Sequence, residues 1–71
     1  MTDSLDQRLL KAHASHDRAA LVSLYTEAAD QAQDETELGF FLTHAYVFAL
    51  EINDARADAL RQRLRHMGRE Q

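Results

Sequence analysis

The sequence predicts an all-α protein of about four helices, arranged as two antiparallel hairpins in a single small domain that covers residues 1–71. Proline is absent and glycine occurs only at positions 39 and 68, so the backbone itself offers few places to break a helix. Apolar residues recur at steps of three and four, which is the spacing of one helix face. Short polar clusters at 15–17, 33–36 and 53–54 supply capping side chains and divide the chain into four helical segments.

The first two helices are predicted over 5–14 and 18–33. The first is short, and Asp3 or Ser4 precedes it as a capping residue. The second has a polar side opposite an apolar stripe, as surface helices of globular proteins do. Its stripe consists of Leu21, Leu24 or Tyr25, Ala28 and Ala32.

The third helix, predicted over 37–52, is apolar nearly all round. Phe40, Val47 and Leu50 lie off the face that we expect to build the core. A helix with two apolar faces is either covered on both sides within its own chain or partly covered by another chain. The predicted core face consists of Leu38, Phe41, Leu42, Ala45, Phe48, Ala49 and Ile52.

The fourth helix is predicted over 55–67. Asn53 tolerates the left-handed backbone conformation and Asp54 can cap the helix. Gly68 supplies a stop at its C-terminal end. The four segments are therefore separated by capping residues and not by proline or glycine turns.

Charge is unevenly distributed along the chain, whose net charge is −4. Residues 1–54 hold three basic and ten acidic groups, whereas residues 55–71 hold five arginines and two acidic groups. An acidic body argues against the whole domain being a nucleic-acid binder. We expect the arginines of the fourth helix to lie near acidic groups of the body, such as Glu27, Asp30, Glu51 or Asp54.

Composition excludes several classes of site and location. Cysteine is absent, so the chain has no disulfide, no thiolate metal site and no thiol nucleophile. The N-terminal residues lack the basic region and apolar run of a secretory signal, and no apolar stretch approaches the ~18 residues that span a bilayer. We therefore expect a cytoplasmic protein that does not bind membranes.

The two halves of the chain resemble each other at an offset of 37 residues, which aligns Asp17 with Asp54. Each half is then a helix, a capping aspartate and a second helix. Paired helices that repeat every ~34 to 40 residues are typical of tetratricopeptide-type arrays. The segment 24–31, LYTEAADQ, resembles the WYxxAAxQG stretch of Sel-like repeats, a branch of the tetratricopeptide superfamily.

A second segment looks like the closing helix pair of such arrays in bacteria. The chain departs from the repeat at Ala32, where the repeat has glycine, and at Leu38-Gly39, which falls about two residues early. The resemblance implies an α-α superhelix of stacked hairpins and a protein-binding role without shared catalytic residues. The residues that carry this second likeness are Ala45, Tyr46, Ala49, Asp54, Ala57, Leu60, Arg61, Leu64 and Met67.

The histidines are the candidates for chemistry. His13 and His16 share a helix face and have Asp17 beside them, which could suit a metal ion, but a complete site needs a further ligand such as His44 or Glu51. A solvated helix end explains the same pattern, and we predict no metal site and no cofactor. His44 lies in mid-helix among aromatic residues, either hydrogen-bonded at the edge of the core or in contact with a partner. No recognisable nucleophile or acid–base pair accompanies it, so we predict that the protein is not an enzyme.

Two functions remain from the sequence. The first is a protein–protein interaction module that binds a protein or peptide and forms a homodimer through Tyr25, Phe40, His44, Val47 and Leu50. The alternative is a small regulatory protein that contacts nucleic acid through the basic surface of the fourth helix, formed by Arg61, Arg63, Arg65 and Arg69. These arginines are scattered around the helix and no aromatic residue lies among them, which favours the first function.

Overall fold

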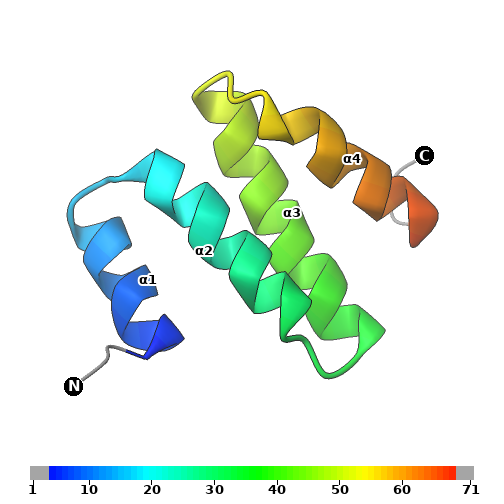
Figure 1. Ribbon diagram of the computed structural model, residues 1–71, viewed down its shortest axis with the longest axis horizontal. Coiled ribbons are helices and arrows are strands. Elements are labelled where there is room, and N and C mark those ends of the chain that lie inside the picture. Colours follow the sequence, from blue (N-terminus) through cyan, green and yellow to red (C-terminus); the bar gives the residue numbers. More distant parts are fainter. Residues whose placement is uncertain (1–3, 69–71) are drawn as a thin grey trace.

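The computed structural model describes residues 4–68, and this part of the chain consists of four helices without a strand. Helix α1 spans Leu5–Ala14, α2 spans Arg18–Asp30, α3 spans Glu35–Glu51 and α4 spans Arg56–His66. Consecutive helices run in opposite directions and each packs against the next (Figure 1). The prediction of an all-α fold built from antiparallel hairpins is confirmed.

The bounds of α1 agree with the prediction, whereas α2 ends earlier and α3 begins earlier than predicted. The N–H of Gln31 donates to the carbonyls of Glu27 and Ala28 at 3.2 Å, which closes α2 after Asp30. The carboxylate of Asp34 then accepts the N–H of Glu37 at 2.8 Å and caps α3. The polar cluster between these helices is therefore divided between the end of one and the first turn of the next.

Side-chain hydrogen bonds to the backbone also mark the start of the two short helices. The hydroxyl of Ser4 accepts the N–H of Gln7 at 3.1 Å, while the Gln7 side chain accepts the N–H of Ser4, which forms a capping box. At α4 the carboxylate of Asp54 accepts the N–H of Arg56 at 2.8 Å, although the N-cap position itself is Ala55. Asp3, the other predicted cap of α1, lies outside the described residues.

The turns after α1 and after α3 have the same geometry. His16 and Asn53 both adopt a φ of 55°, in the left-handed region. The N–H of the aspartate that follows, Asp17 or Asp54, donates to the carbonyl five residues earlier, at 2.9 Å and 2.8 Å respectively. This is the bond that closes a Schellman turn. The two turns are therefore equivalent at an offset of 37 residues.

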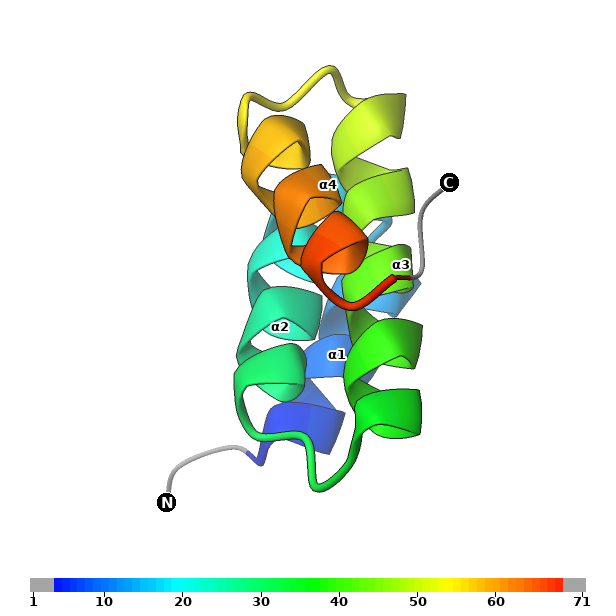
Figure 2. The same cartoon turned by 90° about the vertical axis from the view of Figure 1, so that its right-hand side faces the viewer.

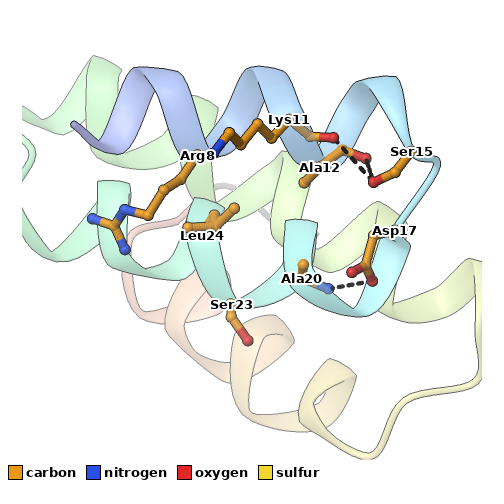
Figure 3. A pocket seen from close by; sticks show the side chains of 8 residues that line it. All are labelled: Arg8, Lys11, Ala12, Ser15, Asp17, Ala20, Ser23 and Leu24. Atoms are coloured by element: carbon orange, nitrogen blue, oxygen red, sulfur yellow. Dashed lines mark hydrogen bonds between the residues drawn. The ribbon is translucent and has the colours of Figure 1, made fainter. Parts of the chain in front are cut away.

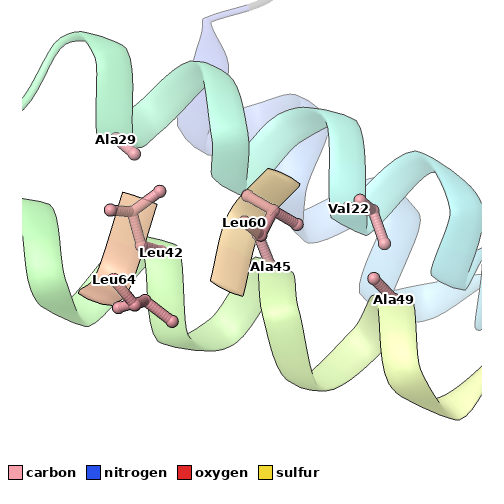
Figure 4. Packing of buried hydrophobic residues seen from close by; sticks show 7 residues of the cluster. All are labelled: Val22, Ala29, Leu42, Ala45, Ala49, Leu60 and Leu64. Atoms are coloured by element: carbon pink, nitrogen blue, oxygen red, sulfur yellow. The ribbon is translucent and has the colours of Figure 1, made fainter. Parts of the chain in front are cut away.

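The core lies where α2, α3 and α4 meet. The most extensive contact is between α2 and α3, and α4 lies over the seam between them with two leucines directed into it (Figure 4). Several of the buried residues are alanines, which allow neighbouring helices to approach closely. The cluster consists of Val22, Ala29, Leu42, Ala45, Ala49, Leu60 and Leu64.

Four residues of the predicted core face of α3 lie nearer the surface than expected. Leu38, Phe41 and Phe48 are half-buried and pack against the edge of the core cluster. Ile52 is 36% exposed because it is the C-cap residue, beyond the last turn of α3. Its inclusion in the core face was therefore wrong.

Helices α1 and α4 lie on opposite sides of the α2–α3 hairpin (Figures 1 and 2). Figure 2 shows α3 along one edge of the molecule, with α2 along the other. Because α3 contacts α2 and α4 through one side, its opposite side faces outward. In the part of the chain from residue 4 to 68, no helix has the length and apolar character needed to cross a bilayer.

Candidate interaction surface

A row of apolar side chains is exposed on the outward side of α3. Phe40 is 55% exposed, Val47 is 44% exposed and Leu50 is 55% exposed. Together with the exposed threonines Thr36 and Thr43, they recur at alternating steps of four and three along α3. We call these five residues the outer stripe. Such alternation is the spacing of a coiled-coil seam, in which one helix packs along another.

Two shallow hollows lie along the outer stripe. The first, of ≈ 310 Å³, is lined by Thr36, Gly39, Phe40, Thr43 and His44. The second, of ≈ 190 Å³, is lined by Thr43, His44, Val47, Phe48 and Glu51. Because Thr43 and His44 line both, the two hollows meet in the middle of α3.

His44 is half-buried and held against its own helix. Its Nδ1 atom lies 2.9 Å from the carbonyl oxygen of Phe40. A carbonyl can only accept, so Nδ1 carries the proton in this hydrogen bond. The His44 ring centroid is 4.3 Å from that of Phe40 and 5.1 Å from that of Tyr25. His44 therefore connects the outer stripe to the aromatic side chains between the helices.

Tyr25 belongs to that aromatic cluster and not to the outer stripe. Its ring stacks on Phe48 with centroids 5.9 Å apart and an interplanar angle of 14°. Burial raises the pKa of the Tyr25 hydroxyl above its ordinary value. Of the five predicted interface residues, the structure thus places Phe40, Val47 and Leu50 together on the outward side of α3, with His44 at the border and Tyr25 behind it.

His13 has a structural role that the sequence did not predict. Its Nε2 atom lies 2.9 Å from the hydroxyl oxygen of Tyr25, and its ring meets Phe48 edge-on at 5.9 Å. These contacts join α1 to both α2 and α3. His16 lies in the turn after α1, and no group of three or more potential metal ligands is assembled within residues 4–68. No sequence signal pairs His13 with Tyr25, because the pairing depends on how α1 crosses α2.

The arginines of α4 approach acidic groups of the body, as predicted. Arg63 Nη2 lies 3.0 Å from an Asp30 carboxylate oxygen. Arg56 Nη2 lies 2.7 Å from Asp54, and its Nη1 donates to the hydroxyl of Ser23 on α2 at 2.6 Å. Hydrogen bonds from Arg56 lower the pKa of Asp54 to about 2. Arg56 thus fastens the beginning of α4 to α2, and Arg63 fastens the last turns of α4 to the end of α2.

The other two predicted acidic partners bind arginines outside α4. Glu27 forms a two-bond pair with Arg8 of α1, at 2.7 and 3.1 Å, and this hydrogen bonding lowers the pKa of Glu27. Glu51, at the end of α3, lies 3.0 Å from Arg18. Acidic groups therefore hold α1 and the beginning of α2 in place, as well as α4.

The predicted basic surface is only partly assembled. Arg61 and Arg65 are exposed, and Arg65 lines a hollow of ≈ 390 Å³ together with Gln62 and His66. Arg63 is engaged with Asp30, and Arg69 lies outside the described residues. Of the predicted basic surface, Arg61 and Arg65 are thus the two exposed arginines that share one face of α4.

A further hollow, of ≈ 440 Å³, lies between α1 and α2 (Figure 3). Several of its polar side chains form hydrogen bonds within or between the helices. The Ser15 hydroxyl donates to the Lys11 carbonyl at 3.0 Å, and the Asp17 carboxylate accepts the N–H of Ala20 at 3.1 Å. Ser23, at the other end, accepts from Arg56. The hollow is therefore a product of helix packing, and the outer stripe is the stronger candidate for binding.

Comparisons with known proteins found no family model, curated protein or solved structure that matches the chain.

Proposed function

We propose that the protein is a helical-repeat interaction module without catalytic activity, which binds a protein or peptide through the outer stripe and forms a homodimer. The observation that carries this proposal is the exposure of Phe40, Val47 and Leu50 in one row on α3. Contiguous exposed apolar patches are typical of interaction surfaces on proteins. The proposal includes the predicted cytoplasmic location.

The equivalence of the two turns supports the helical-repeat part of the proposal. His16 and Asn53 have the same backbone conformation, and Asp17 and Asp54 follow them with matching hydrogen bonds. A tandem array of paired helices repeats the same hairpin, so the turn within each hairpin is expected to have the same backbone geometry. An α-α superhelix of the tetratricopeptide type, as the LYTEAADQ segment suggests, remains the proposed family.

A second candidate function is contact with nucleic acid through α4. The exposed pair Arg61 and Arg65 favours it, since residues four apart share a helix face. The engagement of Arg56 and Arg63 with Asp54 and Asp30 reduces the charge available for phosphate binding. We therefore rank this function below protein binding.

One pair of binding assays separates the two functions. Immobilised wild-type protein, Val47→Glu and the control Gln62→Glu are compared for capture of proteins from native lysate at low and high salt. We expect salt-tolerant capture that Val47→Glu abolishes and Gln62→Glu retains. The same proteins are then titrated with mixed DNA. Affinity for DNA that falls steeply with salt and is lost in Arg61→Gln/Arg65→Gln would replace the proposal with the nucleic-acid function.

A further inference from the structure

The outer stripe has a two-fold pattern. Phe40 lies three residues before Thr43, and Val47 lies three residues after His44. Each is therefore about 5 Å along the helix axis from the midpoint between Thr43 and His44, at ~1.5 Å per residue. The two hollows share this same midpoint. A half-turn about an axis through it exchanges the hollows and exchanges the positions of Phe40 and Val47.

We infer, on the basis of the proposed function, that a second copy of this chain covers the outer stripe, with the two α3 helices antiparallel and the two-fold axis at Thr43 and His44. In this arrangement Phe40 of each copy enters the partner's second hollow, beside the partner's Val47. Val47 in turn enters the partner's first hollow, where Gly39 leaves room. Bulky side chains fill hollows in both directions, as knobs fill holes in a coiled coil.

Charge selects the antiparallel orientation over the parallel one. The first turn of α3 carries Glu35 and Glu37, follows Asp34 and contains no basic residue. A parallel pair would set these carboxylates beside their own copies, and like charges repel at such distances. The antiparallel pair sets them instead near the other end of the partner's α3, where Arg18 lies against Glu51.

The size of the stripe predicts how tightly the copies bind. From Thr36 to Leu50 it is about 21 Å long at ~1.5 Å per residue, and a helix is ~10 Å wide. A contact of this size is well below the ~800 Å² that each partner contributes to a standard stable interface. We therefore expect a weak, reversible dimer whose population rises with protein concentration. Two-fold pairing of identical surfaces is the commonest form of such association.

Single cysteines test the position of the axis, since the chain contains none and any disulfide must join two copies. Thr43→Cys, Thr36→Cys and Gln62→Cys are each oxidised at micromolar concentration and separated on a non-reducing gel. The three positions are all exposed in the monomer, so the last two control for random collision. A disulfide requires Cα atoms about 4.4–6.8 Å apart.

We expect Thr43→Cys to form a disulfide-linked dimer several times faster than either control. Thr36 lies seven residues from Thr43, so its two copies would be about 20 Å apart in the antiparallel pair. Equal cross-linking of Thr36→Cys and Thr43→Cys would indicate a parallel pair and overturn the inference. The inference would also be overturned if neither Thr43→Cys nor Thr36→Cys cross-linked faster than Gln62→Cys.

The combination with Val47→Glu separates failure of this inference from failure of the proposed function. If Thr43→Cys does not cross-link, but Val47→Glu still abolishes capture of another protein, then the second copy is the wrong occupant and the interaction function stands. If adding Val47→Glu to Thr43→Cys leaves cross-linking unchanged, and Val47→Glu alone leaves capture unchanged, both are wrong. Circular dichroism of each variant confirms that the helices are intact before either conclusion is drawn.

Discussion

The two sides of α3 differ in a way that hydrophobicity does not explain. On the inner side Leu42 is 1% exposed, and Ala45 and Ala49 are fully buried. On the outer side Phe40 and Leu50, both larger than alanine, are more than half exposed. Because α2 approaches α3 closely, the inner side has room only for small residues, as the close packing of protein interiors requires. Phe40 meets the rings of Phe41 and His44, yet more than half of its surface stays exposed.

This difference divides α3 into a side that packs in the core and a side that stays exposed. Substitutions on the inner side should change the free energy of unfolding. Substitutions on the outer side should change association and leave the fold intact. Four predictions test that division, beginning with the largest expected effect.

Leu42→Ala is expected to lower the free energy of unfolding by about 2–5 kcal/mol, because it leaves a cavity in the centre of the core. For a domain of this size that approaches the whole stability. Phe40→Ala, the outer-side control, is expected to change the stability of the monomer by less than about 0.5 kcal/mol. Urea denaturation followed by circular dichroism, at concentrations that keep the protein monomeric, measures both. Equal losses for the two variants would contradict the division.

Ala45→Leu tests the inner side from the opposite direction. Ala45 is fully buried between the helices, so extra methyl groups must push them apart, at a cost of about 1–3 kcal/mol. Val47→Leu adds volume on the outer side and should leave thermal unfolding of the monomer unchanged. If Ala45→Leu were as stable as the wild type, the α2–α3 contact would have room for a larger side chain, which would contradict close packing at Ala45.

Tyr25→Phe tests the border between the two sides. It removes the hydroxyl that meets His13 Nε2 while keeping the ring stacked on Phe48. A hydrogen bond of this kind contributes about 0.5–1.5 kcal/mol net. We expect the free energy of unfolding to fall by this amount. We also expect the backbone amides of α1 to exchange hydrogen faster than those of α3. Uniform exchange throughout the chain would show that this contact does not hold α1.

The smallest effect concerns acid stability at the end of α3. The Asp54 pKa is about 2 in the folded state and 3.8 ordinarily, so its ionised form favours folding at pH values above about 4. That contribution is lost as the pH falls from about 4 to about 2. Asp54→Asn should therefore be less stable than the wild type at neutral pH, with the difference narrowing over this window. A difference that is the same at pH 2 and pH 7 would contradict the assignment.

Much of the fold follows from local signals in the sequence. Capping side chains such as Ser4, Asp17 and Asp34 act over one helical turn, so they fixed the helices to within a few residues. The periodicity of α3 likewise separated Phe40, Val47 and Leu50 from Leu42. The error at Ile52 arose because periodicity continues past the point where the helix ends.

The rest of the candidate surface depends on how helices cross, which periodicity does not encode. Tyr25 could have faced either the outer stripe or α1, and its ring turned toward His13 and Phe48. The hollows on either side of His44, by contrast, are lined by residues of α3 alone. The positions of the ion pairs were more predictable, since arginines of the basic α4 lie against Asp30 and Asp54 as expected.

Sedimentation of the wild type and of Val47→Glu across micromolar concentrations tests most directly whether the outer side of α3 is an interface. We expect the wild type to pass from monomer to dimer with rising concentration. We expect Val47→Glu to stay monomeric, with the same helical content by circular dichroism. A wild type that remains a monomer throughout would contradict the homodimer, and loss of helix in Val47→Glu would place Val47 in the core of the fold.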